Sequence, residues 1–195
     1  MCIITVWNRW KWKKIKFGFN LGLNCSNLLG EPLEIYPNSN VSFSNDLGFR
    51  LGVLADYTVS KNFSISPKAE LSLNNSTINL TQADGSVSEF DVMPISLEFM
   101  THFIVKKNNK KLKPYLTSGP NFKIPISIEN DVPKTTLPTK SFLAFDFGIG
   151  MNKSYTYFNL SPEIIYSFGL MNIDQNTVVN SLNFHNISLV FKFMG

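Results

Sequence analysis

Two histidines are the first residues of this 195-residue chain that could do chemistry, because histidine is the usual general base near neutral pH. Ser181 and Ser188 flank His185 in the sequence, and Asp174 precedes all three. Enzymes combine a serine, a histidine and a carboxylate for nucleophilic acyl transfer. We expect His102 at the opposite end of the fold, so the two histidines would not share a site. His185 is therefore either part of an acyl-transfer site or a structural residue at the rim.

Asp146 and Glu163 form a second candidate constellation. A short turn separates their two segments, so we expect them on neighbouring strands and close together. Two adjacent carboxylates repel each other, which suits a general acid/base pair or a cation site. The alternative is structural, with arginine and lysine side chains neutralising both carboxylates.

Other chemistry-bearing motifs are absent from the sequence. It has no GxSxG or HExxH motif, no P-loop, no dinucleotide-binding glycine pattern and no Cys/His spacing typical of a metal site. Cys2 and Cys25 are far apart and predict neither a zinc site nor a disulfide. The net charge is +4, without a Lys/Arg-rich strip interleaved with aromatics, so nucleic acid is not an expected partner. We expect no metal and no cofactor.

The segments that would position these residues have the period of β-strands. With 44% hydrophobic and 16% charged residues the chain is not of a disordered type. No apolar run approaches the roughly 20 residues of a membrane-spanning helix. Apolar and polar residues instead alternate strictly, as in Phe49-Arg50-Leu51-Gly52-Val53, which indicates strands with two different faces. The eight predicted strands are Lys14–Asn24, Leu47–Ser60, Phe63–Asn74, Asp91–Val105, Leu112–Ile124, Ser141–Asn152, Thr156–Gly169 and Ser181–Met194.

The connections between these strands alternate between long and short. Four long connections (Cys25–Asp46, Asn75–Phe90, Pro125–Lys140 and Leu170–Asn180) would lie at one end, and three short turns at the other. An even number of strands with this segregation is typical of bacterial outer-membrane barrels. The predicted fold class is all-β, an eight-stranded antiparallel up-and-down transmembrane β-barrel covering residues 14–195. A soluble barrel or sandwich is the alternative.

The polar face of the strands indicates which side is the interior. Glycines such as Gly52, Gly148 and Gly150 fall on it, and an eight-stranded barrel has an interior barely wide enough for side chains. Small and charged residues would then lie inside and large apolar residues outside. Five cations face five anions in the predicted lumen, and the short turn after strand 2 would bring Asp56 close to Lys68. The predicted lumen charge network consists of Arg50, Asp56, Lys68, Glu70, Glu98, Lys113, Lys123, Asp146, Glu163 and Lys192. Because it neutralises itself, we expect a barrel closed to solutes.

Charges outside the strands are also segregated. The short turns carry lysines and no acid, whereas the long connections are mainly acidic. Basic turns suit the anionic headgroups of a membrane leaflet. We therefore expect the outer membrane as location, with outer-membrane lipid around the barrel, acidic loops outward and both termini periplasmic.

Residues 1–13 do not match the expected strand pattern. A short apolar run precedes Arg9, Lys11 and Lys13, the reverse of the order in a secretory signal. We assign them to a leader, either an eroded signal or a region preceded by a signal upstream of Met1.

Three stretches resemble the PorT-type outer-membrane β-barrel family of Bacteroidetes. They are Lys113-Pro114-Tyr115-Leu116, Phe145-Asp146-Phe147-Gly148-Ile149-Gly150 and, most specifically, Leu160-Ser161-Pro162-Glu163-Ile164-Ile165-Tyr166-Ser167-Phe168-Gly169-Leu170. The resemblance implies the barrel fold and the outer membrane, and it implies a part in type IX protein secretion with periplasmic or secretion-machinery partners. We expect a non-enzymatic structural or interaction component. The alternatives are an orphan barrel or adhesin with binding loops, and a lipid A acyl-modifying barrel enzyme.

Overall fold

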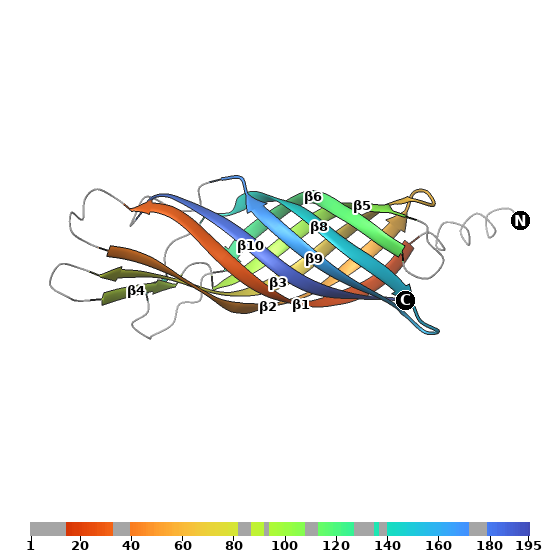
Figure 1. The fold of residues 1–195 in the computed structure, drawn as a ribbon, viewed down its shortest axis with the longest axis horizontal. Coiled ribbons are helices and arrows are strands. Elements are labelled where there is room, and N and C mark those ends of the chain that lie inside the picture. Colours follow the sequence, from red (N-terminus) through yellow and green to blue (C-terminus); the bar gives the residue numbers. More distant parts are fainter. Residues whose placement is uncertain are drawn as a thin grey trace, which may run out of the picture.

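The computed structural model describes residues 15–32, 40–81, 87–91, 94–107, 113–126, 135–136, 140–171 and 179–195. Eight long strands pair with their sequence neighbours, and the first pairs with the last, so the sheet closes into an antiparallel barrel (Figure 1). These strands are β1 (Ile15–Pro32), β2 (Asn40–Thr58), β3 (Phe63–Thr81), β5 (Ile95–Lys106), β6 (Lys113–Ile126), β8 (Phe142–Ser154), β9 (Asn159–Gly169) and β10 (Val179–Met194). The predicted fold class is confirmed.

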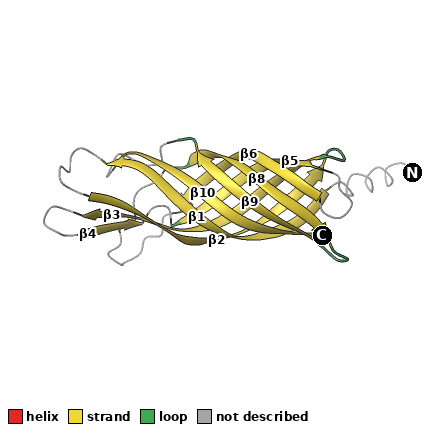
Figure 2. Ribbon diagram, in the orientation of Figure 1, coloured by secondary structure: helices red, strands yellow, loops and turns green. Residues whose placement is uncertain are grey.

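Two short strands lie outside the ring. β4 (Val87–Asp91) pairs with the end of β3, and β7 (Thr135–Thr136) pairs with β4. Together with the outer parts of β2 and β3 they form a sheet that projects beyond the barrel (Figure 2). We call this the projecting sheet, and we call the opposite end, where β1 begins and β10 ends, the turn end.

The register of the strands fixes the tilt and width of the barrel. A circuit of cross-strand partners that starts at Ile15 returns to β1 at Cys25, ten residues further along. Such a stagger tilts the strands by roughly 35–45° to the barrel axis and leaves an interior that side chains can fill. The circuit runs through Ile15, Tyr57, Ile65, Phe103, Ser118, Phe147, Tyr166, Ile187 and Cys25.

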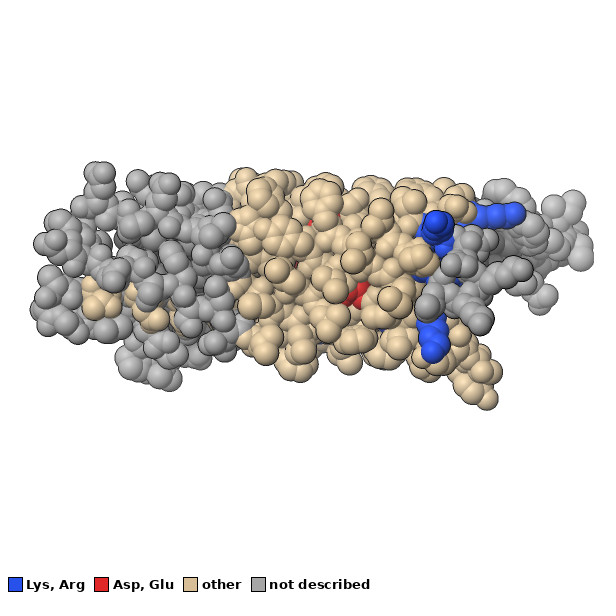
Figure 3. Space-filling view, viewed as in Figure 1, with Lys and Arg blue, Asp and Glu red and all other residues tan. Residues whose placement is uncertain are grey.

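The two faces of the barrel wall have the reverse of the usual polarity. Outward side chains such as Phe17, Phe49 and Leu116 are apolar and at least half exposed, at 62%, 58% and 62%. Inward side chains are mainly polar or charged and buried. On the face that Figure 3 shows, the described surface carries little charge along its middle, and its lysine or arginine side chains gather at the turn end. This polarity suits a barrel surrounded by hydrocarbon.

Glycines at two inward positions make room for larger inward side chains. A Cβ at Gly52 would lie 2.5 Å from the Cγ atom of Glu70, and a Cβ at Gly150 would lie 2.5 Å from the Tyr115 ring. Both distances are too short for real contacts. The absence of a side chain there therefore allows Glu70 and Tyr115 to occupy the lumen.

Several predicted strand limits were wrong. The connections predicted at 25–46 and 75–90 are largely strand, because β1, β2 and β3 continue past the barrel wall and pair there. The strand predicted from Asp91 is divided, with Asp91 in β4 and Ile95 beginning β5. The predicted leader lies outside the described residues. The described residues include no helix long and apolar enough to cross a membrane.

Closure by the β1–β10 pair generates the first prediction. A barrel whose first and last strands are paired has no open edge and resists SDS until heated. We expect unheated protein to migrate faster than boiled protein on an SDS gel. A band that migrates identically before and after boiling would contradict the closed barrel.

Candidate functional site

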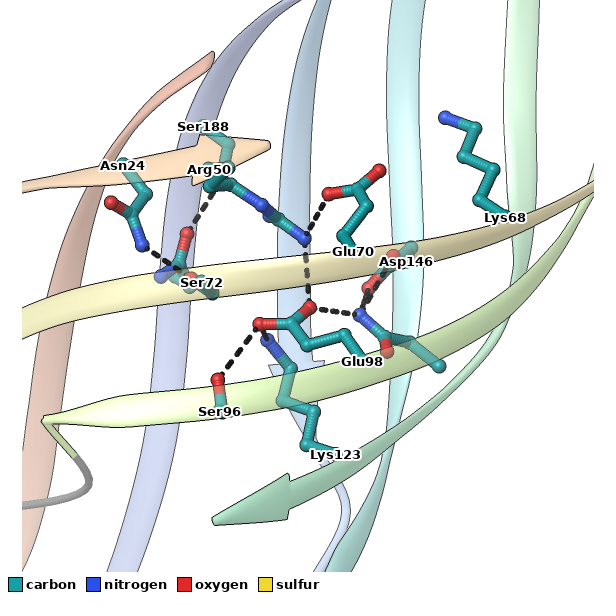
Figure 4. A network of polar contacts seen from close by, with 12 residues as sticks. Asn24, Arg50, Lys68, Glu70, Ser72, Ser96, Glu98, Lys123, Asp146 and Ser188 are labelled. Carbon is teal, nitrogen blue, oxygen red and sulfur yellow. Dashed lines mark hydrogen bonds and ion pairs between the residues drawn. The ribbon is translucent and has the colours of Figure 1, made fainter. Parts of the chain in front are cut away.

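The centre of the lumen is organised around Arg50 and Glu98. Arg50 Nη2 lies 2.7 Å from Glu98 Oε2 and 2.9 Å from Glu70 Oε2, so one guanidinium pairs with two carboxylates. Lys123 Nζ donates to the other oxygen of Glu98 at 3.0 Å. Figure 4 shows Arg50 and Lys123 reaching Glu98 from opposite sides. Asn121 donates to Glu98 at 2.9 Å, and all five side chains are buried.

A second ion cluster, centred on Glu163, lies nearer the turn end. Lys192 donates to one oxygen of this carboxylate, and Lys68 donates to the other at 3.2 Å. The Tyr115 ring covers the Lys192 ammonium, with 4.9 Å between Nζ and the ring centroid. The predicted pair of Asp56 with Lys68 does not form, because Lys68 reaches across the lumen to β9 instead.

Asp56 pairs with a lysine that the sequence places in a turn. Lys106 is the last residue of β5, and its Nζ lies 3.1 Å from Asp56 Oδ2. Lys113, predicted in the lumen network, is exposed because its position at the first residue of β6 brings its side chain to the rim. Lys106 therefore takes the place beside Asp56 that was predicted for Lys68.

Asp146 and Glu163 do not form a pair of carboxylates. Asp146 is the cross-strand partner of Ser167, and Glu163 is the partner of Gly150. Asp146 Oδ2 instead lies 2.9 Å from Nε2 of the buried His102, and Asn121 donates to the same oxygen at 3.1 Å. The predicted acid/base or cation site therefore lacks its geometry, since each carboxylate has separate partners.

A neutral hydrogen-bonded layer lies next to the Arg50 cluster. Asn24 donates to Ser72 at 2.9 Å and to Asn74 at 2.7 Å, and Asn74 donates to Ser96 at 3.2 Å. Ser96 donates to Glu98 at 3.4 Å, which joins this layer to the ion pairs, and Arg50 Nη1 donates to Ser188 at 2.7 Å. Sequence reasoning selected charges and missed these amides and hydroxyls. Their alternation with exposed apolar residues, as in Leu21-Gly22-Leu23-Asn24, was the available signal.

Phe142 and Phe184 lie in the same part of the lumen and are almost fully buried. Their rings meet edge-on with centroids 6.1 Å apart, and Lys123 Nζ lies 5.5 Å from the Phe184 centroid. Aromatic rings thus pack against the end of the polar network.

Among the residues whose side chains the structure describes, Ser188 does not join His185 in an acyl-transfer site. His185 is the partner of Phe168 on β9, and its Nδ1 lies 2.9 Å from the outward-facing hydroxyl of Tyr166. Ser188 is buried on the opposite face and binds Arg50, so it cannot meet His185. The side chains of Ser181 and Asp174 lie outside the described ones.

The described part of the chain holds no group of three or more metal-ligating side chains. Its lumen instead holds interlocked ion pairs that neutralise each other. Burying unpaired charges would cost several kcal/mol each, so the pairs are mutually dependent. These ion pairs join side chains of β2, β3, β5, β6, β9 and β10 across the lumen.

Two variants, one buried and one exposed, test the contribution of the Glu163 cluster to stability. Lys192→Met removes one of two buried partners of Glu163 and should lower the free energy of unfolding by about 3 kcal/mol, the low end for a broken buried pair, because Lys68 remains. Lys113→Met, an exposed control, should change it little. Urea unfolding in lipid vesicles, followed by the gel shift, measures both. Equal stability of the two variants would contradict the importance of this cluster.

Comparisons with known proteins agree with this architecture. The chain matches neisserial surface protein A (NspA) with a TM-score of 0.54 at 11% identity, covering 90% of this chain and 95% of that one. It matches the outer membrane protein OprG from Pseudomonas aeruginosa with a TM-score of 0.52 at 10% identity, covering 92% and 91%. At such low identity these likenesses show the fold alone. A comparison with curated proteins found no match. Residues 8–175 match the family model described as an outer membrane protein beta-barrel domain, so the chain belongs to that family of outer-membrane β-barrel proteins.

Proposed function

We propose that this protein is a non-enzymatic interaction component of the outer membrane, closed to solutes, that binds its partners through the projecting sheet. The observation that carries this proposal is the filled lumen. Arg50 and Lys68 each reach an acid on another strand, Glu98 and Glu163, and so cross-link the wall through the space that a channel would need. Transport is therefore disfavoured, and function is assigned to the ends of the barrel.

The projecting sheet supplies a surface suited to a protein partner. β2 and β3 remain paired from Asn40↔Thr81 to Asp46↔Asn75, beyond the segment in which β2 pairs with β1. Over Asn40–Asp46 the described residues contain no second neighbour for β2, so one edge of this strand offers backbone groups. Partner strands can add to such an edge.

Protein secretion is the specific role that we propose for this interaction. It rests on the PorT-type stretches, of which Leu160–Gly169 forms most of β9 and supplies the central Glu163. In the orientation that we propose, the projecting sheet faces outward and both termini face the periplasm. The turn-end lysines then lie beside the inner leaflet, which suits its anionic lipids.

The filled lumen generates a prediction on conductance. Purified protein in a planar bilayer should show no stable open channel, because porins with aqueous channels need about 16 strands and eight leave room only for side chains. The conductance of the unmodified protein is compared with that of the Arg50→Ala variant, which lacks the central guanidinium. A sustained conductance in the unmodified protein would contradict the closed barrel and with it the proposed function.

A strain lacking the gene tests the secretion role. We expect it to lose proteins from the culture medium, and we expect the intact gene to restore them. In a second variant, a two-residue turn replaces the β3–β4 hairpin. This variant should still shift on an unheated gel but should not restore export. An epitope tag in the same hairpin should be accessible to antibody on intact cells. Normal export without the gene would overturn the secretion role, and full rescue by the shortened variant would overturn the assignment to the projecting sheet.

A further inference from the structure

A furrow runs along the outside of β6 toward the turn end. Ser118 is the cross-strand partner of both Phe103 and Phe147, so a small side chain lies between two large ones. Leu116, two residues closer to the rim on the same face of β6, lies between Val105 and Ile149. The floor of the furrow is therefore β6, with β5 on one side and β8 and β9 on the other.

The furrow is long and almost wholly apolar. Its part nearest the rim has a volume of about 690 Å³ and is lined by Val105, Leu116, Ile149, Met151 and Ile164, among others. A hollow of about 540 Å³ shares four of these residues and continues past Ser118. Such an elongated apolar space in a membrane-facing wall fits a hydrocarbon chain.

Cationic groups gather where the furrow reaches the rim. Lys107 lines the end of the furrow and also lines a cavity of about 190 Å³ in the mouth of the barrel. Among the described residues that line this mouth, Asp56 is the only acid, and Lys106 already binds it at 3.1 Å. The mouth therefore has an excess of positive charge. Its other lysines are Lys16, Lys61, Lys107 and Lys113.

We propose that this rim is a binding site for one anionic phospholipid, with an acyl chain in the β6 furrow and the phosphate at Lys107 and the neighbouring mouth lysines. The occupant follows from the two chemistries that meet at Lys107, an apolar furrow and an uncompensated cluster of ammonium groups. A soluble anion would use only the second, and a neutral lipid only the first. The site does not depend on which protein binds the projecting sheet.

Native mass spectrometry of the purified protein tests the site. The protein is titrated with phosphatidylglycerol and with phosphatidylcholine that carries the same acyl chains. We expect phosphatidylglycerol to be retained preferentially. Lys107→Gln should weaken its binding about fivefold, as expected for the loss of one lysine at a membrane surface. Lys153→Gln is the matched control, because Lys153 is at the same end but contacts the Tyr155 ring and lines neither cavity.

A second pair of variants tests the furrow. Leu116→Trp fills it, whereas Leu21→Trp makes the same change on β1, opposite β6 in the ring of eight strands. We expect only Leu116→Trp to weaken phosphatidylglycerol binding, with the gel shift showing that both variants fold. Equal retention of the two lipids, or no effect of Lys107→Gln, would overturn the proposal. Pyrophosphate, a soluble anion without acyl chains, is the last probe. If pyrophosphate alone stabilised the protein, and if Leu116→Trp left that stabilisation unchanged, the proposal would also be overturned. The mouth would then bind a soluble anion.

Discussion

The structure depends on one constraint, the pairing of buried charges inside a wall whose outside is apolar. Closure of eight strands with a stagger of ten residues leaves a narrow interior. Arg50, at its centre, is 1% exposed and can remain charged there because Glu70 and Glu98 both face it. Every inward charge of this kind needs partners from other strands, since lipid surrounds the wall. The ion pairs therefore join distant parts of the chain.

The fold could be predicted from the sequence more completely than the site. Alternation such as Phe49-Arg50-Leu51-Gly52 marks both the strand and its inward face, and that information is local. Pairing is not local. Lys68 meets Glu163, which is 95 positions away in the sequence, because the stagger of the barrel brings β3 and β9 to the same level of the lumen. The sequence shows that charges balance, but it does not show which strand each side chain reaches.

The predicted limits of the strands were also wrong, for a physical reason that differs from the reason for the wrong ion pairs. Inside the membrane, alternation is imposed by lipid on one side and the lumen on the other. Beyond it this alternation is not imposed, so the outer part of β3 contains a run of polar residues, Asn74-Asn75-Ser76-Thr77, and such a segment looks like a loop in the sequence. Backbone pairing continues there all the same. Position relative to the rim also explains why the predictions for Lys106 and Lys113 were wrong. Both lie at strand ends, where a small difference in height decides whether a side chain lies in the lumen or in water.

A polar lumen also explains why the strands can pair in only one register. If the interior were apolar, both faces of each strand would be alike, and a slip by one residue would cost little. Here a one-residue slip of β9 would turn Glu163 into the lipid and Ile164 into the lumen, separating Glu163 from Lys68 and Lys192. Each such exposed or unpaired charge is expensive, so the network penalises wrong registers more than it stabilises the right one. The resulting barrel holds two ends in place, the projecting sheet and the basic rim, and these are the ends to which we assign the proposed binding.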